Sequence, residues 1–298
     1  MRPIVEVEAL CVQALAKRGK DRIPLIQDVS FQIHPGEMLA LVGESGSGKS
    51  VTAGAVLGLL PNALHIGSGS LRFQGEDVLA WTEKKRRGLL GSQIGCVFQD
   101  YQGSFTPFRK IGKQLTEMIR THHSLSKATA KDLALEWLDQ VALPAERVYD
   151  SYPFQLSGGQ RQRTALAAAM MLRPALVVAD EPTTALDVLT GERVLDLLAE
   201  LQMQVGCAVL LISHDLRHVM KRADTVAVMK DGRIVECEAT EMIRRRASHP
   251  YTQTLLHARP LLTDLDAGLD WENEEVVSSE RHEGVDGVES LADREPAV

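Results

Sequence analysis

The chain has 298 residues, a formal net charge of −7 and 44% hydrophobic residues, which suits one large α/β domain with appendages. No run approaches the roughly 18 apolar residues of a membrane-spanning helix, and the N-terminal segment has early acidic residues and no apolar core of a signal peptide. Aromatic residues make up only 4% of the chain, which gives no support to nucleic-acid binding.

Negative charge is concentrated at the C-terminal end of the chain. Residues 261–298 contain 12 acidic and 2 basic side chains, a charge of −10, which leaves +3 for residues 1–260. The segment is rich in Gly, Ser and Glu and has little hydrophobic periodicity. We therefore predict a domain over residues 1–258, followed by an acidic tail over residues 259–298 without stable structure.

The four cysteines are scattered and form no C-x-x-C pair, so neither a disulfide framework nor a zinc site is expected. We predict buried or half-buried free thiols at Cys11, Cys96, Cys207 and Cys237.

Short strands and turns are expected on both sides of a glycine-rich segment at residues 43–50. Apolar and acidic residues alternate over Ile4–Leu10 and apolar and polar residues over Val29–Ile33, which predicts strands with one solvated face. A turn is predicted at Lys17–Asp21, and a short strand followed by a turn at Leu71–Gly75. The basic run Lys84–Arg87 is interpreted as a solvated helix face rather than a phosphate or lipid site.

A glycine-rich segment at residues 43–50 matches the phosphate-binding pattern G-x-x-x-x-G-K-S/T. It follows the apolar strand Met38–Val42 and precedes the apolar helix Val51–Leu60, the context that this motif requires. Glycines let the backbone N–H groups curl around phosphate oxygens at a helix N-terminus. The predicted phosphate-binding residues are Gly43, Glu44, Ser45, Gly46, Ser47, Gly48, Lys49, Ser50, Val51 and Thr52.

The middle of the chain predicts a strand and then an inserted helical segment. The strand Ile94–Phe98 ends at Gln99, and residues 109–152 carry apolar positions at helical spacing. Farther on, Ser157 is a plausible N-cap for a helix that continues through the Ala-rich stretch Thr164–Leu172. Taken alone, this serine with two following glycines is only a weak signal for an anion site.

Two further buried strands end in polar residues. Leu176–Glu181 ends in the carboxylates of Asp180 and Glu181, and Ala208–Ser213 is followed by His214. The carboxyl ends of parallel strands are where ligands bind in such sheets, and a carboxylate beside a phosphate loop is placed to hold Mg²⁺. A helix over Val188–Leu201 and a hairpin over residues 225–235 are also predicted.

The order and spacing of these motifs resemble the ATP-binding subunit of an ATP-binding-cassette (ABC) transporter over residues 1 to about 258. The most specific element is the L-S-G-G-Q signature, which other phosphate-loop enzymes lack. The resemblance implies an α/β fold with a parallel RecA-like sheet, an N-terminal antiparallel β subdomain and an α-helical subdomain at about residues 105–172. The signature comprises Leu156, Ser157, Gly158, Gly159 and Gln160.

The resemblance also implies a role for each motif residue. Ser50, Gln99 and Asp180 would hold Mg²⁺. Glu181 would act as base or orienter for the attacking water, His214 would hold the γ-phosphate in line, and Gln99 would sense it. The signature would complete the ATP site of the opposite subunit, with Asp187 at the dimer interface, so that one chain holds half of each site.

The implied partners are a second ATPase subunit, either a different cassette or a copy of this chain, two permeases and an extracytoplasmic substrate-binding protein. The chain would lie peripherally on the cytoplasmic face of the membrane. One departure is the missing aromatic residue that usually stacks on adenine before the second strand. Leu15, Arg18 or Ile23 could cover the base instead.

Phe105-Thr106-Pro107, Ser151–Phe154 and His249–Thr252 resemble the peptide and nickel importer group. The segment Ile111–Gln114 and the missing aromatic favour nickel or metal-chelate cargo slightly over peptides. Two alternatives stay open: a soluble ABC ATPase in translation or repair, which would usually carry two cassettes, and a non-hydrolysing regulatory cassette, against which Glu181 and His214 both argue.

Overall fold

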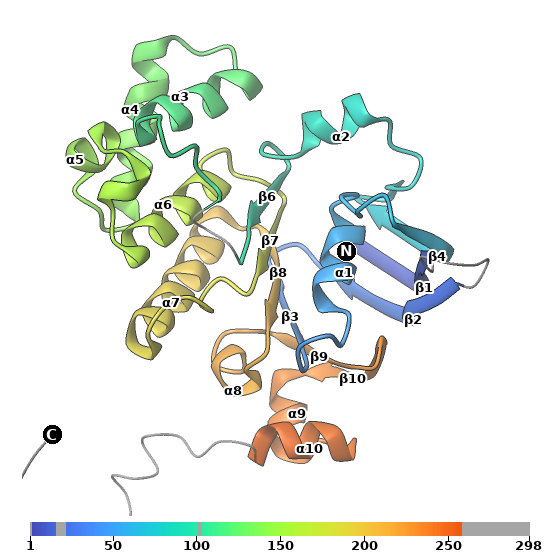
Figure 1. Cartoon of the computed structure of the whole chain (residues 1–298). Coiled ribbons are helices and arrows are strands. Elements are labelled where there is room, and N and C mark those ends of the chain that lie inside the picture. The colour runs from blue at the N-terminus through green and yellow to red at the C-terminus, as the bar shows by residue number, and fades with distance from the viewer. Residues whose placement is uncertain (1, 16–21, 100–102, 258–298) are drawn as a thin grey trace, which may run out of the picture. The chain divides into compact units, whose positions relative to one another are not determined.

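The computed structural model describes residues 2–15, 22–99 and 103–257 (Figure 1). The predicted turn at Lys17–Asp21 and the predicted acidic tail lie outside these residues. The described part forms a six-stranded sheet, a four-stranded sheet and the helices that cover them. Among the described residues, no helix combines the length and apolar character needed to cross a bilayer.

The six-stranded sheet has the order β10-β9-β3-β8-β7-β6, and all its strands except the antiparallel edge strand β10 run parallel. Its central strand β3 is buried along its whole length, as expected of a parallel strand covered on both faces. The strands are β3 (Met38–Val42), β6 (Ile94–Val97), β7 (Leu176–Asp180), β8 (Ala208–Ser213), β9 (Thr225–Lys230) and β10 (Arg233–Ala239).

Successive side chains of β3 enter two different hydrophobic cores. Met38, Ala40 and Val42 pack on one face of the sheet, and Leu39 and Leu41 on the other, because side chains alternate along a strand. Helices α6 and α7 cover the first face, and α1 and the four-stranded sheet cover the second (Figure 1). These helices are α1 (Lys49–Val56), α6 (Gly158–Met170) and α7 (Val188–Val205).

The four-stranded sheet is antiparallel, with the order β2-β1-β4-β5. The strands predicted at Ile4–Leu10 and Val29–Ile33 are too short, because β-bulges interrupt the alternation of β1 and β2, whereas the predicted strand and turn at Leu71–Gly75 match the end of β4 and the turn after it. Ala9 has φ +47° and Asp28 has φ +58°, and the register of β1 shifts between Val7 and Leu10. The strands are β1 (Val5–Leu15), β2 (Arg22–Ile33), β4 (Leu64–Phe73) and β5 (Glu76–Asp77).

The inserted helical segment is confirmed. Ile111, Leu115 and Ile119 form the buried face of its first helix and join Trp137 and Leu138 in the same core. The helices are α3 (Ile111–His122), α4 (Lys127–Gln140) and α5 (Ala145–Asp150), grouped together in Figure 1. The turn η1 (Pro153–Gln155) leads from them to α6.

Three smaller predictions are corrected or confirmed. The helix predicted over Val51–Leu60 begins earlier, at Lys49, and ends at Val56, because Gly58 takes φ +63°. The basic run lies on α2 (Glu83–Leu89), which has no buried residue, as predicted. All four cysteines are free, but Cys237 is exposed rather than buried.

The C-terminal part of the described chain follows the β9–β10 hairpin, whose tight turn was predicted. Asp231 and Gly232 both have positive φ, as a two-residue hairpin turn requires. Two short helices follow the hairpin, α9 (Thr240–Arg246) and α10 (Pro250–His257), and one short helix, α8 (Leu216–Val219), precedes it.

Candidate nucleotide site

The residues predicted to bind nucleotide follow the carboxyl ends of four neighbouring parallel strands. The glycine-rich loop follows β3, His214 follows β8, Asp180 ends β7, and Gln99 comes two residues after β6. Because β3, β8, β7 and β6 are adjacent in this order, their carboxyl ends form one edge of the sheet. The fold therefore brings together side chains that are far apart in the sequence.

The glycine-rich loop lies against strand β9. A Cβ atom at Gly43 would stand 2.1 Å from the carbonyl oxygen of Met229, so no larger residue fits there. Gly48 caps α1 with φ +108°, a backbone conformation that glycine adopts without steric cost. The loop leads directly into α1, whose free N–H groups and helix dipole favour an anion.

The Lys49 ammonium is buried, and its ion pair with the nearest carboxylate is long. Its ammonium Nζ donates hydrogen bonds to the carbonyl oxygens of Gly43 and Glu44, each at 2.8 Å, and only 4% of the side chain is exposed. The nearest carboxylate oxygen, Glu181 Oε1, is 4.0 Å away. Burial lowers the Lys49 pKa from its ordinary value. A phosphate group beside this ammonium would supply the missing negative charge.

Ser50 and Asp180 place two oxygen ligands beside the loop. The Ser50 hydroxyl donates to Asp180 Oδ1 at 3.2 Å. Burial raises the Asp180 pKa, and the hydrogen bond from Ser50 opposes that rise only in part. Hydroxyl and carboxylate oxygens suit Mg²⁺, which keeps several waters and draws ligands from substrate phosphates. Within the described ranges, no group of three His, Cys, Asp or Glu forms a metal cage.

The Glu181 carboxylate is contacted by side chains from several segments of the chain. Its Oε2 accepts hydrogen bonds from Thr184 Oγ1 at 2.8 Å and from Gln99 Nε2 at 3.4 Å, and His214 Nδ1 lies 3.4 Å away. Glu181 has φ +45°, which is rare for a residue with a side chain, and its N–H donates to the Ile212 carbonyl at 3.0 Å. The fold therefore holds Glu181 in a strained backbone conformation at the sheet edge.

His214 is half exposed and is followed by a residue that organises the next helix. Asp215 caps α8, because its Oδ1 accepts from the backbone N–H of Arg217 at 3.0 Å and of His218 at 3.4 Å. The N–H of Asp215 donates to Ser213 Oγ at 3.0 Å. The chain on the C-terminal side of His214 is thus fixed to the end of β8.

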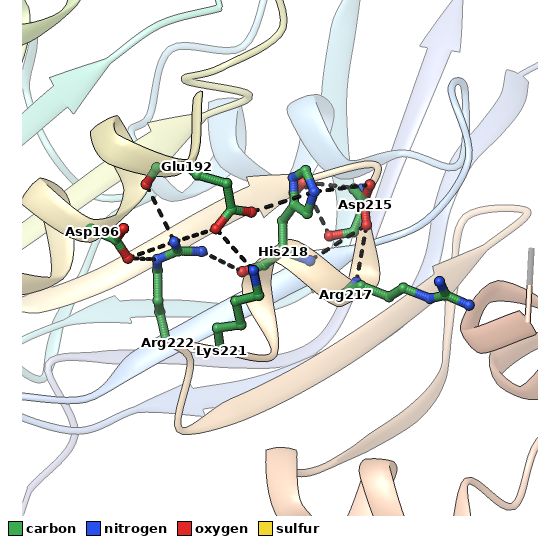
Figure 2. Close-up of polar contacts among 8 residues, drawn as sticks. Glu192, Asp196, Asp215, Arg217, His218, Lys221 and Arg222 are labelled. Atoms are coloured by element: carbon green, nitrogen blue, oxygen red, sulfur yellow. Dashed lines mark hydrogen bonds and ion pairs between the residues drawn. The ribbon is translucent and has the colours of Figure 1, made fainter. Parts of the chain in front are cut away.

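An ion-pair network connects α8 with α7 (Figure 2). Glu192 on α7 contacts Arg222 at 2.6 Å, Lys221 at 3.1 Å and His218 at 3.4 Å. The Arg222 side chain is 5% exposed and also pairs with Asp196. Burial raises the Glu192 pKa, but the hydrogen bonds from Arg222 and Lys221 outweigh it and leave the pKa below its usual value. This network links the helix after Asp187 to the helix after His214.

The signature segment begins α6 with a reciprocal capping box. Ser157 Oγ accepts from the N–H of Gln160 at 3.2 Å, and Gln160 Oε1 accepts from the N–H of Ser157 at 3.0 Å, which confirms the predicted N-cap. Leu156 is buried, and a Cβ atom at Gly159 would stand 3.1 Å from Thr190 Cγ2.

Asp187 lies beside the signature rather than beside the phosphate loop. It caps α7 by accepting from the N–H of Thr190 at 3.0 Å, and it lines a cavity of about 460 Å³ together with Ser157, Gly158 and Gly159. In the described part of the chain, no hydrogen bond joins residues 156–160 to the phosphate loop. The signature segment and Asp187 therefore lie together, apart from the hydrogen bonds of the phosphate loop.

Two groups of predicted residues remain to be placed: Val51 and Thr52 in α1, and the residues predicted to cover adenine. Val51 is half-buried, and Thr52 is fully buried and donates to the Gly48 carbonyl at 3.1 Å, so both support the loop from behind. Of the residues predicted to cover adenine, Ile23 is 53% exposed. The side chain of Leu15 and the whole of Arg18 lie outside what the structure describes.

Sequence reasoning missed three contacts to the site. Thr184 holds Glu181, the N–H of Gly232 in the hairpin turn donates to the Ser47 carbonyl at 3.0 Å, and the Tyr251 hydroxyl accepts from the N–H of Glu44 at 3.1 Å. Tyr251 belongs to the His249–Thr252 segment, which the sequence marked only as a subgroup resemblance. Nothing in the local sequence around Thr184 or Gly232 signals the contact that each makes.

Comparisons with known proteins agree with this geometry. The family described as "ABC transporter" matches residues 26–184. The chain is 40% identical to the oligopeptide transport ATP-binding protein OppD of Bacillus subtilis, over 87% of this chain and 72% of that protein. It is 41% identical to the dipeptide transport ATP-binding protein DppD of Escherichia coli, over 79% of this chain and 72% of that protein.

Another relative is longer than this chain. The ABC transporter ATP-binding protein YejF of Escherichia coli is 45% identical over 79% of this chain, which spans 45% of that protein. Among solved structures, the dimeric cassette MJ0796, in a post-hydrolysis state bound to ADP and Pi, has a TM-score of 0.70 at 27% identity. The match covers 79% of this chain and 98% of that chain. The chain therefore belongs to the ABC transporter family, as an ATP-binding-cassette ATPase that uses ATP and Mg²⁺.

Proposed function

We propose that this chain is the ATP-hydrolysing subunit of an ABC importer and that its predicted site residues have the roles expected of them. The observation that carries the assignment is the convergence of Gln99, His214 and Thr184 on the Glu181 carboxylate, beside a buried Lys49. A non-hydrolysing cassette has no need of a carboxylate held beside Lys49 by a strained backbone.

In the proposed mechanism the chain supplies positioning and charge rather than covalent chemistry. Loop N–H groups and Lys49 bind the phosphates, and Glu181 orients the attacking water with His214 beside it. Ser50, Asp180 and Gln99 would hold Mg²⁺, which would supply positive charge beside the phosphates.

We propose that hydrolysis requires a dimer in which the signature of one subunit completes the site of the other. The division of each chain into a phosphate-loop half and a signature half supports this, and the solved neighbour MJ0796 is dimeric. The second subunit is either a different cassette chain or a copy of this one. Asp187, which shares a cavity with the signature, is the proposed interface residue.

A groove supports docking to a permease. A cavity of about 660 Å³ lies between α3 and the β6 edge and is lined by apolar side chains, among them Phe98, Phe105 and Met118. Phe98 is 44% exposed, unusual for a large apolar side chain one position before Gln99. We propose that two permease subunits each insert a short helix into such a groove, which holds the cassette peripherally on the cytoplasmic face of the membrane.

The proposed cargo is a peptide delivered by an extracytoplasmic substrate-binding protein. OppD and DppD, the relatives named above, are an oligopeptide and a dipeptide transport protein. The earlier preference for nickel or a metal chelate stays a prediction and takes second place. The domain limits, residues 1–258 with a helical subdomain at about 105–172 and a tail at 259–298, are likewise part of the proposal.

The experiment that tests the ATPase assignment is the substitution Glu181→Gln. We expect ATP binding to remain within about threefold of wild type, because Lys49 and the loop are untouched. Phosphate release should fall by about 100-fold or more, and the protein should accumulate as an ATP-bound dimer. The measurements are phosphate release, equilibrium nucleotide binding and size-exclusion chromatography with light scattering. Unchanged turnover would refute the role of Glu181.

The experiment that tests transport uses membranes containing this chain and its neighbouring permeases. Stimulation of ATP turnover by a peptide with its binding protein would support the peptide class, and stimulation by a nickel chelate would support the other class. A chain that never associates with membranes would favour the soluble ATPase.

A further inference from the structure

We propose that Tyr251 is a positioning residue for the phosphate loop and that it couples nucleotide binding to the docking of helix α10. The inference rests on the proposed nucleotide site but not on the cargo or the permease. It assigns a function to Tyr251 of the His249–Thr252 segment, for which the site description above gives only the contact with Glu44.

One peptide group of the loop is held from both ends. The N–H of Glu44 donates to the Tyr251 hydroxyl at 3.1 Å. The carbonyl of the same peptide group belongs to Gly43 and accepts from Lys49 Nζ at 2.8 Å. The Tyr251 hydroxyl therefore fixes the orientation of the peptide group that positions the Lys49 ammonium.

Tyr251 is well placed to act as a fixed point. Tyr251 is only 8% exposed, so little water can reach the hydrogen bond between its hydroxyl and the loop N–H and take the place of either partner. Lys230 Nζ lies 4.9 Å from the centre of the tyrosine ring, a cation–π contact with the end of strand β9. The ring is thus held from the side of the same strand against which Gly43 packs.

Helix α10 is itself anchored near both of its ends, to strand β10 at its start and to helix α8 at its last turn. Before its first turn, the Glu236 carboxylate on β10 accepts from the N–H of Ser248 at 2.7 Å, the Ser248 hydroxyl at 2.9 Å and the N–H of His249 at 3.2 Å. At its last turn, Arg217 Nε on α8 donates to the Leu256 carbonyl at 2.9 Å. Glu236 is 8% exposed, so this anchor is nearly removed from solvent.

The two anchors hold α10 in place, and the Tyr251 hydroxyl connects α10 through the Gly43–Glu44 peptide group to the ammonium of Lys49. A ligand that fixes the Gly43–Glu44 peptide group fixes the partner of Tyr251, and a docked α10 prepares that peptide group for the ligand. Because linkage is reciprocal, nucleotide binding must stabilise α10 by the same free energy by which α10 stabilises nucleotide binding.

The first test is Tyr251→Phe, which removes the hydroxyl and keeps the ring. We expect the Kd for the non-hydrolysable analogue AMP-PNP with Mg²⁺ to rise about threefold to tenfold, because the Glu44 N–H loses its acceptor. The KM for ATP should rise with it, and kcat should change less than about twofold, since Glu181 and His214 are not touched.

The matched control is Tyr149→Phe. Tyr149 also has a hydroxyl in a hydrogen bond, with Thr116 Oγ1 at 2.9 Å, but it lies in the helical segment α3–α5. This variant should bind AMP-PNP as wild type does. Equal Kd values for the two variants would overturn the proposal.

The second test is hydrogen exchange of the full chain with and without AMP-PNP. In wild type, the nucleotide should slow exchange in residues 250–257 as well as in the phosphate loop. In Tyr251→Phe, slowing should remain in the loop and be lost in α10, which a purely structural role of the tyrosine would not produce. Nucleotide that leaves α10 exchange unchanged in wild type would overturn the coupling.

A second variant reaches the same connection from its far end. Glu236→Gln weakens the anchor of α10 without touching the loop, and we expect faster exchange in α10 together with a raised Kd for AMP-PNP. Faster exchange with an unchanged Kd would contradict the coupling. Wild-type protein that fails to bind AMP-PNP at all would overturn the proposed nucleotide site itself, a result distinguishable from loss of coupling alone.

Discussion

At the scale of single residues, the phosphate loop is defined by the space around its backbone. Gly43 lies so close to the Met229 carbonyl that even one added carbon must displace the loop or strand β9. The Gly43–Glu44 peptide group positions Lys49 and contacts Tyr251, so a displacement at Gly43 directly reaches the ammonium that we propose binds phosphate.

We therefore predict that Gly43→Ala lowers the free energy of unfolding by about 1–3 kcal/mol, the usual cost of overpacking. Nucleotide affinity should fall by more than about tenfold. Thermal melting and AMP-PNP titration measure the two effects. The control is Gly88→Ala on the exposed helix α2, where an added Cβ meets nothing within 4 Å and φ is not positive. Equal behaviour of the two variants would contradict the close approach at Gly43.

At the scale of elements, an ion-pair network joins helix α7, which follows strand β7, to helix α8, which follows strand β8. Helix α7 begins at the Asp187 cap, and α8 begins directly after His214 and Asp215. Glu192 joins them by contacting His218, Lys221 and Arg222 at once (Figure 2). Because Arg222 is nearly buried, loss of Glu192 leaves a poorly solvated cation with one carboxylate, that of Asp196, in place of two.

We predict that Glu192→Ala lowers stability by about 2 kcal/mol and the melting temperature by about 4–8 °C. Turnover should fall several-fold while AMP-PNP affinity stays near that of wild type, because His214 loses support and the phosphate loop does not. The matched control is Glu117→Ala, which breaks the exposed pair with Arg109 and should change stability by less than about 1 kcal/mol. A melting temperature unchanged by Glu192→Ala would refute the structural role of the network.

At the scale of the whole molecule, the phosphate loop and the signature segment belong to different parts of the fold. Lys49, Asp180 and Glu181 lie at the sheet edge, whereas Ser157 and Asp187 share a separate cavity. A mutation in the signature should therefore affect assembly without affecting nucleotide binding by the single chain.

We predict that adding Ser157→Arg to Glu181→Gln abolishes the ATP-dependent dimer while the monomer keeps its affinity for AMP-PNP. Light scattering distinguishes the 32.7 kDa chain from a particle of twice that mass. The control is Ser126→Arg in the same background, because Ser126 is also an exposed N-cap serine, on α4. It loses a cap of the same kind and should leave the dimer intact. A dimer that survives Ser157→Arg would contradict a site completed in trans.

Sequence reasoning reached the parts of this protein that depend on local chemistry. The motif around Lys49 and Ser50, the Ser157 cap, the buried strand ending at Asp180 and the hairpin turn at Gly232 all follow from residue type and spacing within a few positions. It failed at β1 and β2, where bulges at Ala9 and Asp28 interrupt the alternation from which strands are inferred.

The sequence by itself determined the fold class, the family resemblance and the segments that form the site, because each has a signature in neighbouring residues. Only the tertiary structure decided that Gln99, Thr184 and His214 all meet Glu181, that Glu192 connects α7 with α8, and that Tyr251 contacts the phosphate loop. These contacts join residues whose proximity comes from the order of strands in the sheet. Strand order is set by packing on the two faces of the sheet, and no pattern within one segment records it.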